Sequence, residues 1–284
     1  MKPDPHKIVN GIVKVAALPM VYVKLSEALK NPKTSNKDLE VILSEDAALA
    51  SRVLRLVNSA LYSFPSRIDT ISRAVTIMGQ QQLHDIVLAC SFINLFNKLP
   101  QDIVNMESFW RHSIACGIAS RIVAVLRREQ NVERFFIAGL LHDIGRLILY
   151  MELPEQAQSI LLRAREEGEL LYKTEHAALG FHHAMLGALL LKHWKLPDSL
   201  VEAVACHHAP KTARRYKVEA SIVHLADIIC HVMQLGTSGE CFVPALDQAA
   251  WSLVDIQEDA VPNLLDQLGV QSTEAVTFIM GEVA

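Results

Sequence analysis

Hydrophobic residues recur along the chain at the spacing of helix faces. Between residues 41 and 57, apolar side chains fall three or four positions apart, as they do on the buried faces of α-helices. Residues 80–97 and 108–128 are two further amphipathic stretches with the same period. Runs of β-branched residues in strict alternation, which are typical of strands, are missing. The pattern therefore predicts an all-α fold of about a dozen helices.

Capping and turn residues indicate where several of these helices begin and end. Ser35, with Asp38 three positions later, resembles a capping box. Thr70 is expected to cap a helix that Gly79 ends. In the second half of the chain, the expected helix starts are Pro154, Thr174, Pro197 and Pro210. The connections are short, and no Gly/Ser-rich linker divides the chain.

The amino-acid composition is typical of a folded protein. Apolar residues make up 51% of the 284 positions and charged residues 20%, which excludes a disordered chain. No apolar run approaches the roughly 18 residues of a membrane span, and the N-terminal residues lack the layout of a signal peptide. The five cysteines show no CxxC spacing and are expected to be reduced thiols. We therefore expect a cytoplasmic protein with no membrane partner.

Charge and histidine are distributed unevenly between the two halves. Residues 1–100 carry 12 Lys/Arg against 8 Asp/Glu, whereas residues 101–284 carry 15 against 23 and hold ten of the twelve histidines. This asymmetry predicts an N-terminal helical subdomain over 1–100 and a helical bundle with acidic C-terminal helices over 101–284. The seam is expected near Lys98–Pro100, where an apolar stretch ends. The acidic second half argues against nucleic acid as a partner.

The second half contains five short clusters of histidine and aspartate. They are FWRHS (109–113), GLLHDIG (139–145), FHHAMLG (181–187), ACHHAP (205–210) and HLADII (224–229). Imidazole and carboxylate ligands suit divalent Fe, Mn, Zn or Mg, and a bundle that supplies them from several helices fixes their geometry. A single helical histidine is more often a half-buried polar residue than a ligand. The pair His142–Asp143 differs, because it lies among apolar residues and is costly to bury without a metal or a partner.

Several separated motifs resemble known families. The order of His112, His142–Asp143 and Asp227 resembles the H…HD…D pattern of the HD-domain superfamily of metal-dependent phosphohydrolases. Segments in the N-terminal half are similar to the helical part of the HDOD family, and so is HHAMLGALLLKHWKLPDSLVEAVACHHAP (182–210). The resemblance covers about residues 15–232. It implies a bacterial signalling module with an HD-type, phosphodiesterase-like helical bundle.

The resemblance also implies which residues bind metal. The primary ligands would be His112, His142, Asp143 and Asp227, converging on one divalent ion. Further ligands, matching the extra histidines of the related HD-GYP phosphodiesterases, would be His183, His207 and His208, near a second ion. We therefore expect one or two divalent ions as cofactor.

Three departures from those phosphodiesterases concern catalysis. Arg146 stands where they have a lysine after HDIG; it cannot deprotonate but can still hold a phosphate, so Asp143 and Arg146 are the expected catalytic residues. The GYP loop is absent, and Ser108 stands in place of a carboxylate. These departures argue against a trinuclear site for cyclic dinucleotides.

Two functions stay open at this point. The first is a regulatory module on a metal-binding scaffold with slow or no turnover, which implies a signalling partner protein. The second is an active metal-dependent phosphohydrolase, which implies a nucleotide or phosphate-ester ligand. In the N-terminal half, RLVNSALY (55–62) has two interpretations: its polar residues cap and pack a helix, or this region regulates access to the bundle, as the family suggests.

Overall fold

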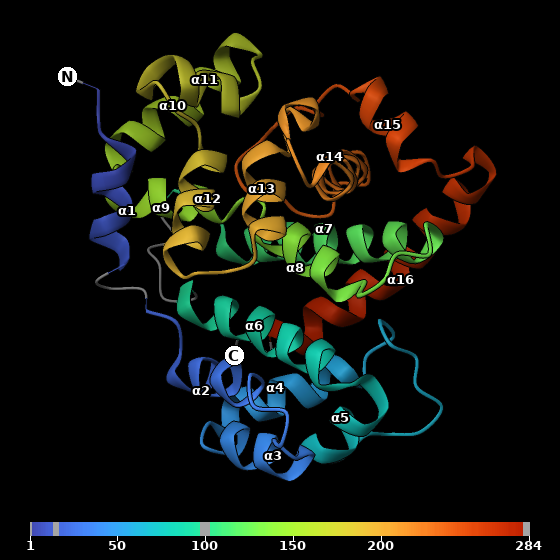
Figure 1. The fold of residues 1–284 in the computed structure, drawn as a ribbon. Coiled ribbons are helices and arrows are strands. Elements are labelled where there is room, and N and C mark those ends of the chain that lie inside the picture. The colour runs from blue at the N-terminus through green and yellow to red at the C-terminus, as the bar shows by residue number, and fades with distance from the viewer. Residues whose placement is uncertain (1, 14–16, 97–102, 281–284) are drawn as a thin grey trace. The chain divides into compact units, whose positions relative to one another are not determined.

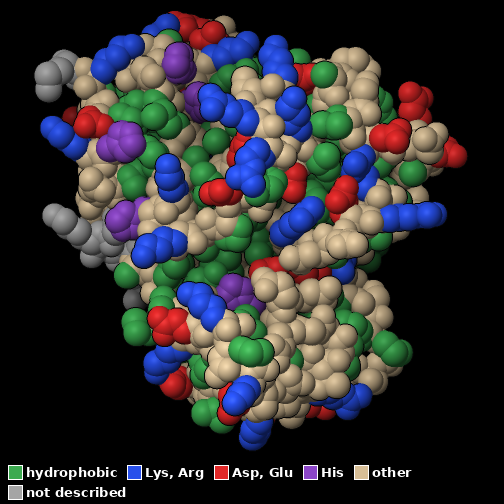
Figure 2. All heavy atoms as spheres, in the orientation of Figure 1, with side chains coloured by type: hydrophobic (Ala, Val, Ile, Leu, Met, Phe, Trp, Pro, Cys, Tyr) green, Lys and Arg blue, Asp and Glu red, His purple; other side chains and the backbone are tan. Residues whose placement is uncertain are grey.

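The structure, a computed structural model, describes residues 2–13, 17–96 and 103–280, and its regular elements are all helices (Figure 1). This confirms the all-α prediction. Within this described part, no helix combines the length and the apolar character that a membrane span needs. Figure 2 shows basic and acidic side chains interspersed over the visible face. All five cysteines are unpaired, as expected for reduced thiols.

The chain divides into two compact units, each built from two separate segments. The unit that we call the histidine unit comprises residues 1–17 and 98–265, and the small unit comprises 18–97 and 266–284. The N-terminal residues thus group with the second half of the sequence, and the C-terminal residues group with the first half. The expected seam at Lys98–Pro100 lies outside the described residues. The expected division into an N-terminal subdomain over residues 1–100 and a helical bundle over residues 101–284 stays a prediction.

The histidine unit contains most of the helices. They are α1 (Pro5–Val13), α7 (Met106–Leu126), α8 (Glu133–Leu141), α9 (Ile144–Glu152), α10 (Pro154–Glu167), α11 (Leu171–Leu179), α12 (His183–His193), α13 (Asp198–Cys206), α14 (Lys217–Val232) and α15 (Gln248–Val254). Short 3-10 turns occur at Pro210–Thr212 and Glu258–Ala260. Helix α7 packs against α8 and α14, and α12 packs against α9 and α13.

Among the described residues, the small unit contains five complete helices and the C-terminal part of a sixth. The complete helices are α2 (Met20–Ala28), α3 (Asn36–Ser44), α4 (Ala47–Val57), α5 (Ile71–Met78) and α6 (Gln80–Phe96). The boundary between the units falls within α16 (Val261–Met280), whose residues from Asp266 onward belong to the small unit. Helix α6 packs against α2, α4 and α5.

Local signals set several helix ends. The Ser35–Asp38 capping box opens α3, and Thr70 caps α5, which Gly79 ends. Helix α10 begins at Pro154, α13 follows Pro197, and Pro210 begins a 3-10 turn.

The expected helix start at Thr174 is wrong. Helix α11 begins three residues earlier, at Leu171. The Leu171 amide donates a 2.7 Å hydrogen bond to Glu240 Oε2, 69 positions away in the sequence. The start of this helix therefore depends on a tertiary contact, which local sequence signals do not report.

Helix α7 is buried around most of its circumference, which explains its weak amphipathic pattern. It meets α8 backbone to backbone, because a Cβ atom at Gly139 would lie 2.4 Å from the Cys116 carbonyl oxygen. A side chain larger than glycine would separate the two helices. This contact brings His112 of α7 close to His142 at the end of α8.

Candidate metal centre

Four side chains from three helical segments form a first group of candidate ligands. His112 and Cys116 come from α7, His142 follows α8, and Asp227 comes from α14; one ligand atom of each lies within 4.8 Å of the others. The Nε2 atoms of His112 and His142 lie 3.2 and 3.5 Å from Asp227 Oδ1. His231, one turn further along α14, places its Nε2 3.2 Å from the same oxygen.

A second group lies beside the first and consists of Asp143, His183, His207 and His208, again within 4.8 Å of one another. His183 Nε2 lies 2.8 Å and His207 Nε2 3.8 Å from Asp143 Oδ1. His208 Nε2 lies 3.0 Å from His183 Nε2. The other oxygen of Asp143, Oδ2, is 3.3 Å from His142 Nε2. Asp143 therefore borders both groups, so the arrangement offers two adjacent positions that share one carboxylate.

The imidazole rings are oriented from behind. The Nδ1 atoms of His142 and His207 each donate to the backbone carbonyl three residues earlier, at 2.7 and 2.8 Å. With the proton on Nδ1, each Nε2 presents its lone pair to the centre. His183 Nδ1 lies 2.6 Å from Glu175 Oε2, a carboxylate–histidine pair of the kind that supports metal ligands.

Four atoms that face the centre make no hydrogen bond of good geometry with a described residue, although an oppositely charged or ionisable group lies within 4 Å of each. They are His142 Nε2, His207 Nε2, Asp143 Oδ1 and Asp227 Oδ1. Their residues are at most 3% exposed, so these atoms are shielded from bulk solvent. A buried polar group without a good hydrogen bond costs about 1–3 kcal/mol, and divalent cations bound by the two groups would contact these four atoms. The nitrogen and carboxylate donors suit Fe, Mn or Zn better than a purely oxygen-binding ion.

The protonation states also fit a metal. Burial lowers the pKa of His112 to about 4 and holds the pKa of His207 well below its usual value. Burial acts in the same direction on His142, but the carboxylates of Asp143 and Asp227 outweigh it and raise the pKa of His142. Burial would raise the pKa of Asp227, but the neighbouring imidazoles hold it well below its usual value. Without metal, the ionised carboxylates thus retain a proton on His142, which a cation would displace.

Arg146 lies behind this centre and is 1% exposed. Its Nη1 donates to Ser238 Oγ at 2.9 Å, and its Nε lies 3.5 Å from Asp143 Oδ1 and 3.9 Å from Glu175 Oε1. The guanidinium is therefore used within the protein to hold two carboxylates. Its expected contact with a substrate phosphate stays a prediction.

Sequence reasoning missed four residues of this site: Cys116, His231, Glu175 and Ser238. The first two each lie four positions after a predicted ligand on the same helix, and that spacing was available as a signal. Glu175 lies eight positions before its partner His183, outside helical spacing. Ser238, whose hydroxyl donates a short hydrogen bond to Asp143 Oδ2, comes from a distant segment. Neither position is marked by a local signal.

Comparison with known sequences identifies a family. The model of the HDOD domain matches residues 15–210. A protein of Treponema pallidum (strain Nichols), described as uncharacterized, is 24% identical over 223 residues, which cover 78% of this chain and 43% of the relative. The chain thus spans less than half the length of that curated relative.

Solved structures with the same fold come from several bacteria. An HDOD domain protein of unknown function from Geobacter sulfurreducens superimposes with a TM-score of 0.81 at 22% identity, covering 96% of this chain and 97% of the other. A candidate phosphohydrolase from Shewanella amazonensis gives 0.75 at 24% identity, with coverage of 96% and 97%. A candidate signal transduction protein from Marinobacter aquaeolei gives 0.72 at 19% identity, covering 94% of this chain and 60% of the other. These likenesses show the fold.

Proposed function

The chain belongs to the HDOD family, and from this premise we propose that it is a bacterial signalling module built on an HD-type metal centre with slow or no hydrolytic turnover. One observation carries the proposal: two adjacent groups of candidate ligands converge on one centre, yet every predicted ligand except His208 is buried from solvent. A site that keeps its ligands favours metal binding, and a site that excludes solvent disfavours turnover.

The proposed ion positions follow the two groups. The first ion would be held by His112, His142 and Asp227, and the second by His183, His207 and His208, with Asp143 between them. When bound, a divalent ion supplies a Lewis acid that activates water at neutral pH.

Slow turnover follows from how the surrounding residues are used. A substrate must reach the centre, but the predicted ligands other than His208 are at most 3% exposed. Arg146 is engaged with Asp143 and Glu175, and the Ser238 hydroxyl occupies Asp143 Oδ2. Catalysis requires groups that bind the transition state more tightly than the substrate. With these residues committed to one another, little binding energy is left for a phosphate ester.

The second candidate is an active phosphohydrolase on a nucleotide or phosphate ester, which the unpaired ligand atoms favour. A structural relative from Shewanella amazonensis carries the name of a candidate phosphohydrolase. If the chain is instead a regulatory module, a signalling partner protein in the bacterial cytoplasm would bind it. The five unpaired cysteines support that compartment.

Metal analysis and a phosphodiesterase assay separate the two candidates. The wild-type chain, the His142→Ala, Asp143→Ala double variant and a His193→Ala control, which alters an exposed histidine, are loaded with Mn²⁺ or Fe²⁺. We expect one or two ions in the wild type and the control and fewer in the double variant, with no robust hydrolysis of cyclic di-GMP by any of them. Rapid turnover that only the double variant loses would establish the enzyme instead. Equal metal content in all three would refute the metal centre.

A further inference from the structure

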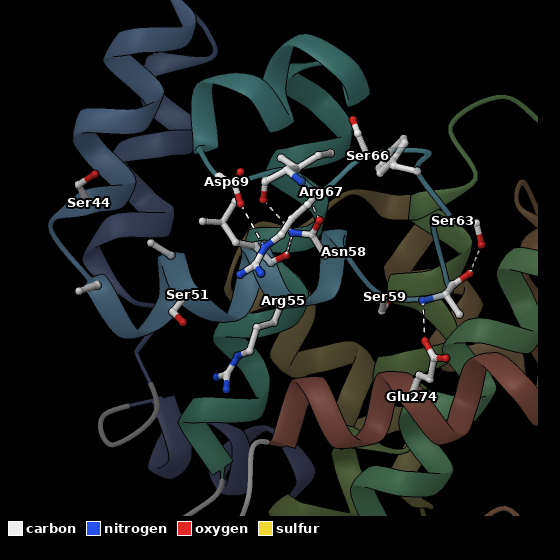
Figure 3. A pocket seen from close by; sticks show the side chains of 16 residues that line it. Ser44, Ser51, Arg55, Asn58, Ser59, Ser63, Ser66, Arg67, Asp69 and Glu274 are labelled. Atoms are coloured by element: carbon white, nitrogen blue, oxygen red, sulfur yellow. Dashed lines mark hydrogen bonds and ion pairs between the residues drawn. The ribbon is translucent and has the colours of Figure 1, made fainter.

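The small unit contains a cavity of about 990 Å³ (Figure 3). One wall is the outer face of α4, where Ala47, Ala50 and Ser51 leave room because their side chains are small. The other walls are the loop over residues 58–69 and Glu274 of α16. The volume is at the upper end of the range of small-molecule sites.

Specific hydrogen bonds hold these walls in place. Asn58 joins the two ends of the loop: its Nδ2 donates to the carbonyl oxygens of Leu54 (2.7 Å) and Ile68 (2.8 Å), and its Oδ1 accepts from the Ile68 amide at 2.8 Å. The Ala60 amide donates to Glu274 Oε2 at 3.0 Å, although 214 positions separate the two in sequence. The cavity is therefore formed before any ligand arrives, which lowers the cost of binding one.

The charges around the cavity are not balanced pair by pair. Arg67 and Asp69 form an ion pair at 3.1 Å, and Glu274 accepts the Ala60 amide. Arg55 has no hydrogen bond or ion pair with any described residue, and in Figure 3 its side chain extends from α4 away from the bonded network. The lining carries two arginines and two carboxylates, and Arg55 is the arginine without an ion pair among the described residues.

We propose that this cavity binds a mononucleotide, with Arg55 as its phosphate contact. A guanidinium presents paired N–H donors that match phosphate oxygens. Inorganic phosphate alone would leave most of the cavity empty. Half-buried Phe64 lines the wall, stacked parallel to Tyr62 with ring centroids 5.9 Å apart, and offers an aromatic surface to a base.

This site also gives RLVNSALY (55–62) a role beyond packing. Asn58 fixes the loop, as the packing interpretation requires, while Arg55 supplies the charge. The proposal is independent of the metal centre, whose candidate ligands all lie in the histidine unit.

Isothermal titration of the full-length, chelator-treated chain with AMP tests the proposal, because removal of metal prevents phosphate binding at the other centre. We expect AMP to bind and Arg55→Glu to weaken the affinity by about tenfold or more. Arg55→Lys should give an intermediate loss, since lysine keeps the charge but not the paired donors. Arg163→Ala, an exposed arginine of α10, is the matched control and should bind as the wild type does.

Adenosine and inorganic phosphate identify the part of the ligand that is recognised. Both should bind more weakly than AMP. The proposal is overturned if AMP fails to bind at millimolar concentration, if Arg55→Glu binds it unchanged, or if adenosine binds equally well. Inorganic phosphate that equals AMP would overturn the nucleotide assignment. Thermal unfolding of Arg55→Glu should match the wild type, because Arg55 is exposed.

Discussion

A Cβ atom on Gly145 would lie 1.9 Å from the carbonyl oxygen of His183, so α9 and α12 cross in backbone contact at this point. The same crossing places Asp143, two residues before Gly145, 2.8 Å from His183. The close approach of the two helices therefore explains why the HDIG motif has a glycine at position 145. It brings the shared carboxylate and the first histidine of the second group together.

We predict that Gly145→Ala separates these helices. Overpacking of this kind costs about 1–3 kcal/mol of unfolding free energy, and the second ion should be lost while the first remains. Urea denaturation and metal stoichiometry measure the two effects. Gly269→Ala is the control, because a Cβ there meets nothing within 4 Å and lies within α16. An alanine at 145 with unchanged stability would contradict the close contact.

The primary ligand set could be predicted because its separated motifs, His112, His142–Asp143 and Asp227, resemble the pattern of a known family. His142 is the C-cap residue of α8 and Asp143 the N-cap residue of α9, so the turn between these helices directs both side chains to the centre. Helix caps such as Thr70 are local, since the side chain bonds to an amide three residues away.

The contacts that close the site could not be predicted, because they depend on the path of a distant loop. Ser238 reaches Arg146 across 92 positions, and the loop turns at Gly236 and Gly239, which have φ values of 81° and 116°. At Gly236 a Cβ would lie 2.3 Å from the Ser108 carbonyl oxygen. No periodicity reports such an approach. The sequence also grouped Asp143 with the first ion alone, whereas its two oxygens face both groups.

A second prediction concerns metal-linked stability. Because ligand atoms of His142, His207, Asp143 and Asp227 face the centre without a hydrogen bond of good geometry, added Mn²⁺ should stabilise the chelator-treated protein. A cation at a hundred times its dissociation constant adds about 2.7 kcal/mol. Thermal unfolding with increasing Mn²⁺ measures the shift. Asp227→Ala should abolish most of it, and His193→Ala should leave it intact. A shift of equal size in Asp227→Ala would mean that the ion binds elsewhere.

A third prediction separates two roles of Arg146. If it holds Asp143 and Glu175, as its contacts indicate, Arg146→Met leaves two buried carboxylates without their cation. Removal of one partner of a buried ion pair costs about 3–5 kcal/mol. The loss should appear in urea denaturation of the metal-free protein, where no phosphate is present. Wild-type stability with reduced binding of a phosphate ester would instead support the substrate-contact role.

The last prediction concerns the loop of the small unit. Asn58 is the only side chain that bonds both Leu54 and Ile68 among the hydrogen bonds described for this loop. Asn58→Ala removes three hydrogen bonds, but the side chain is exposed and water replaces part of them, so we expect a loss of about 1–2 kcal/mol. Asn58→Asp keeps an acceptor for the Ile68 amide but neither donor, and its loss should be intermediate in size. Ser51→Ala, on the same face of α4 and without a hydrogen bond among the described residues, is the control and should be neutral.

Urea denaturation gives the free energies of unfolding, and the rate of proteolysis within residues 59–67 reports on the loop itself. Faster cleavage in Asn58→Ala than in Ser51→Ala is expected, because opening the loop no longer breaks the bonds to Ile68. Equal cleavage rates would show that the buried side chains of Leu61 and Ile68, not Asn58, hold the loop closed.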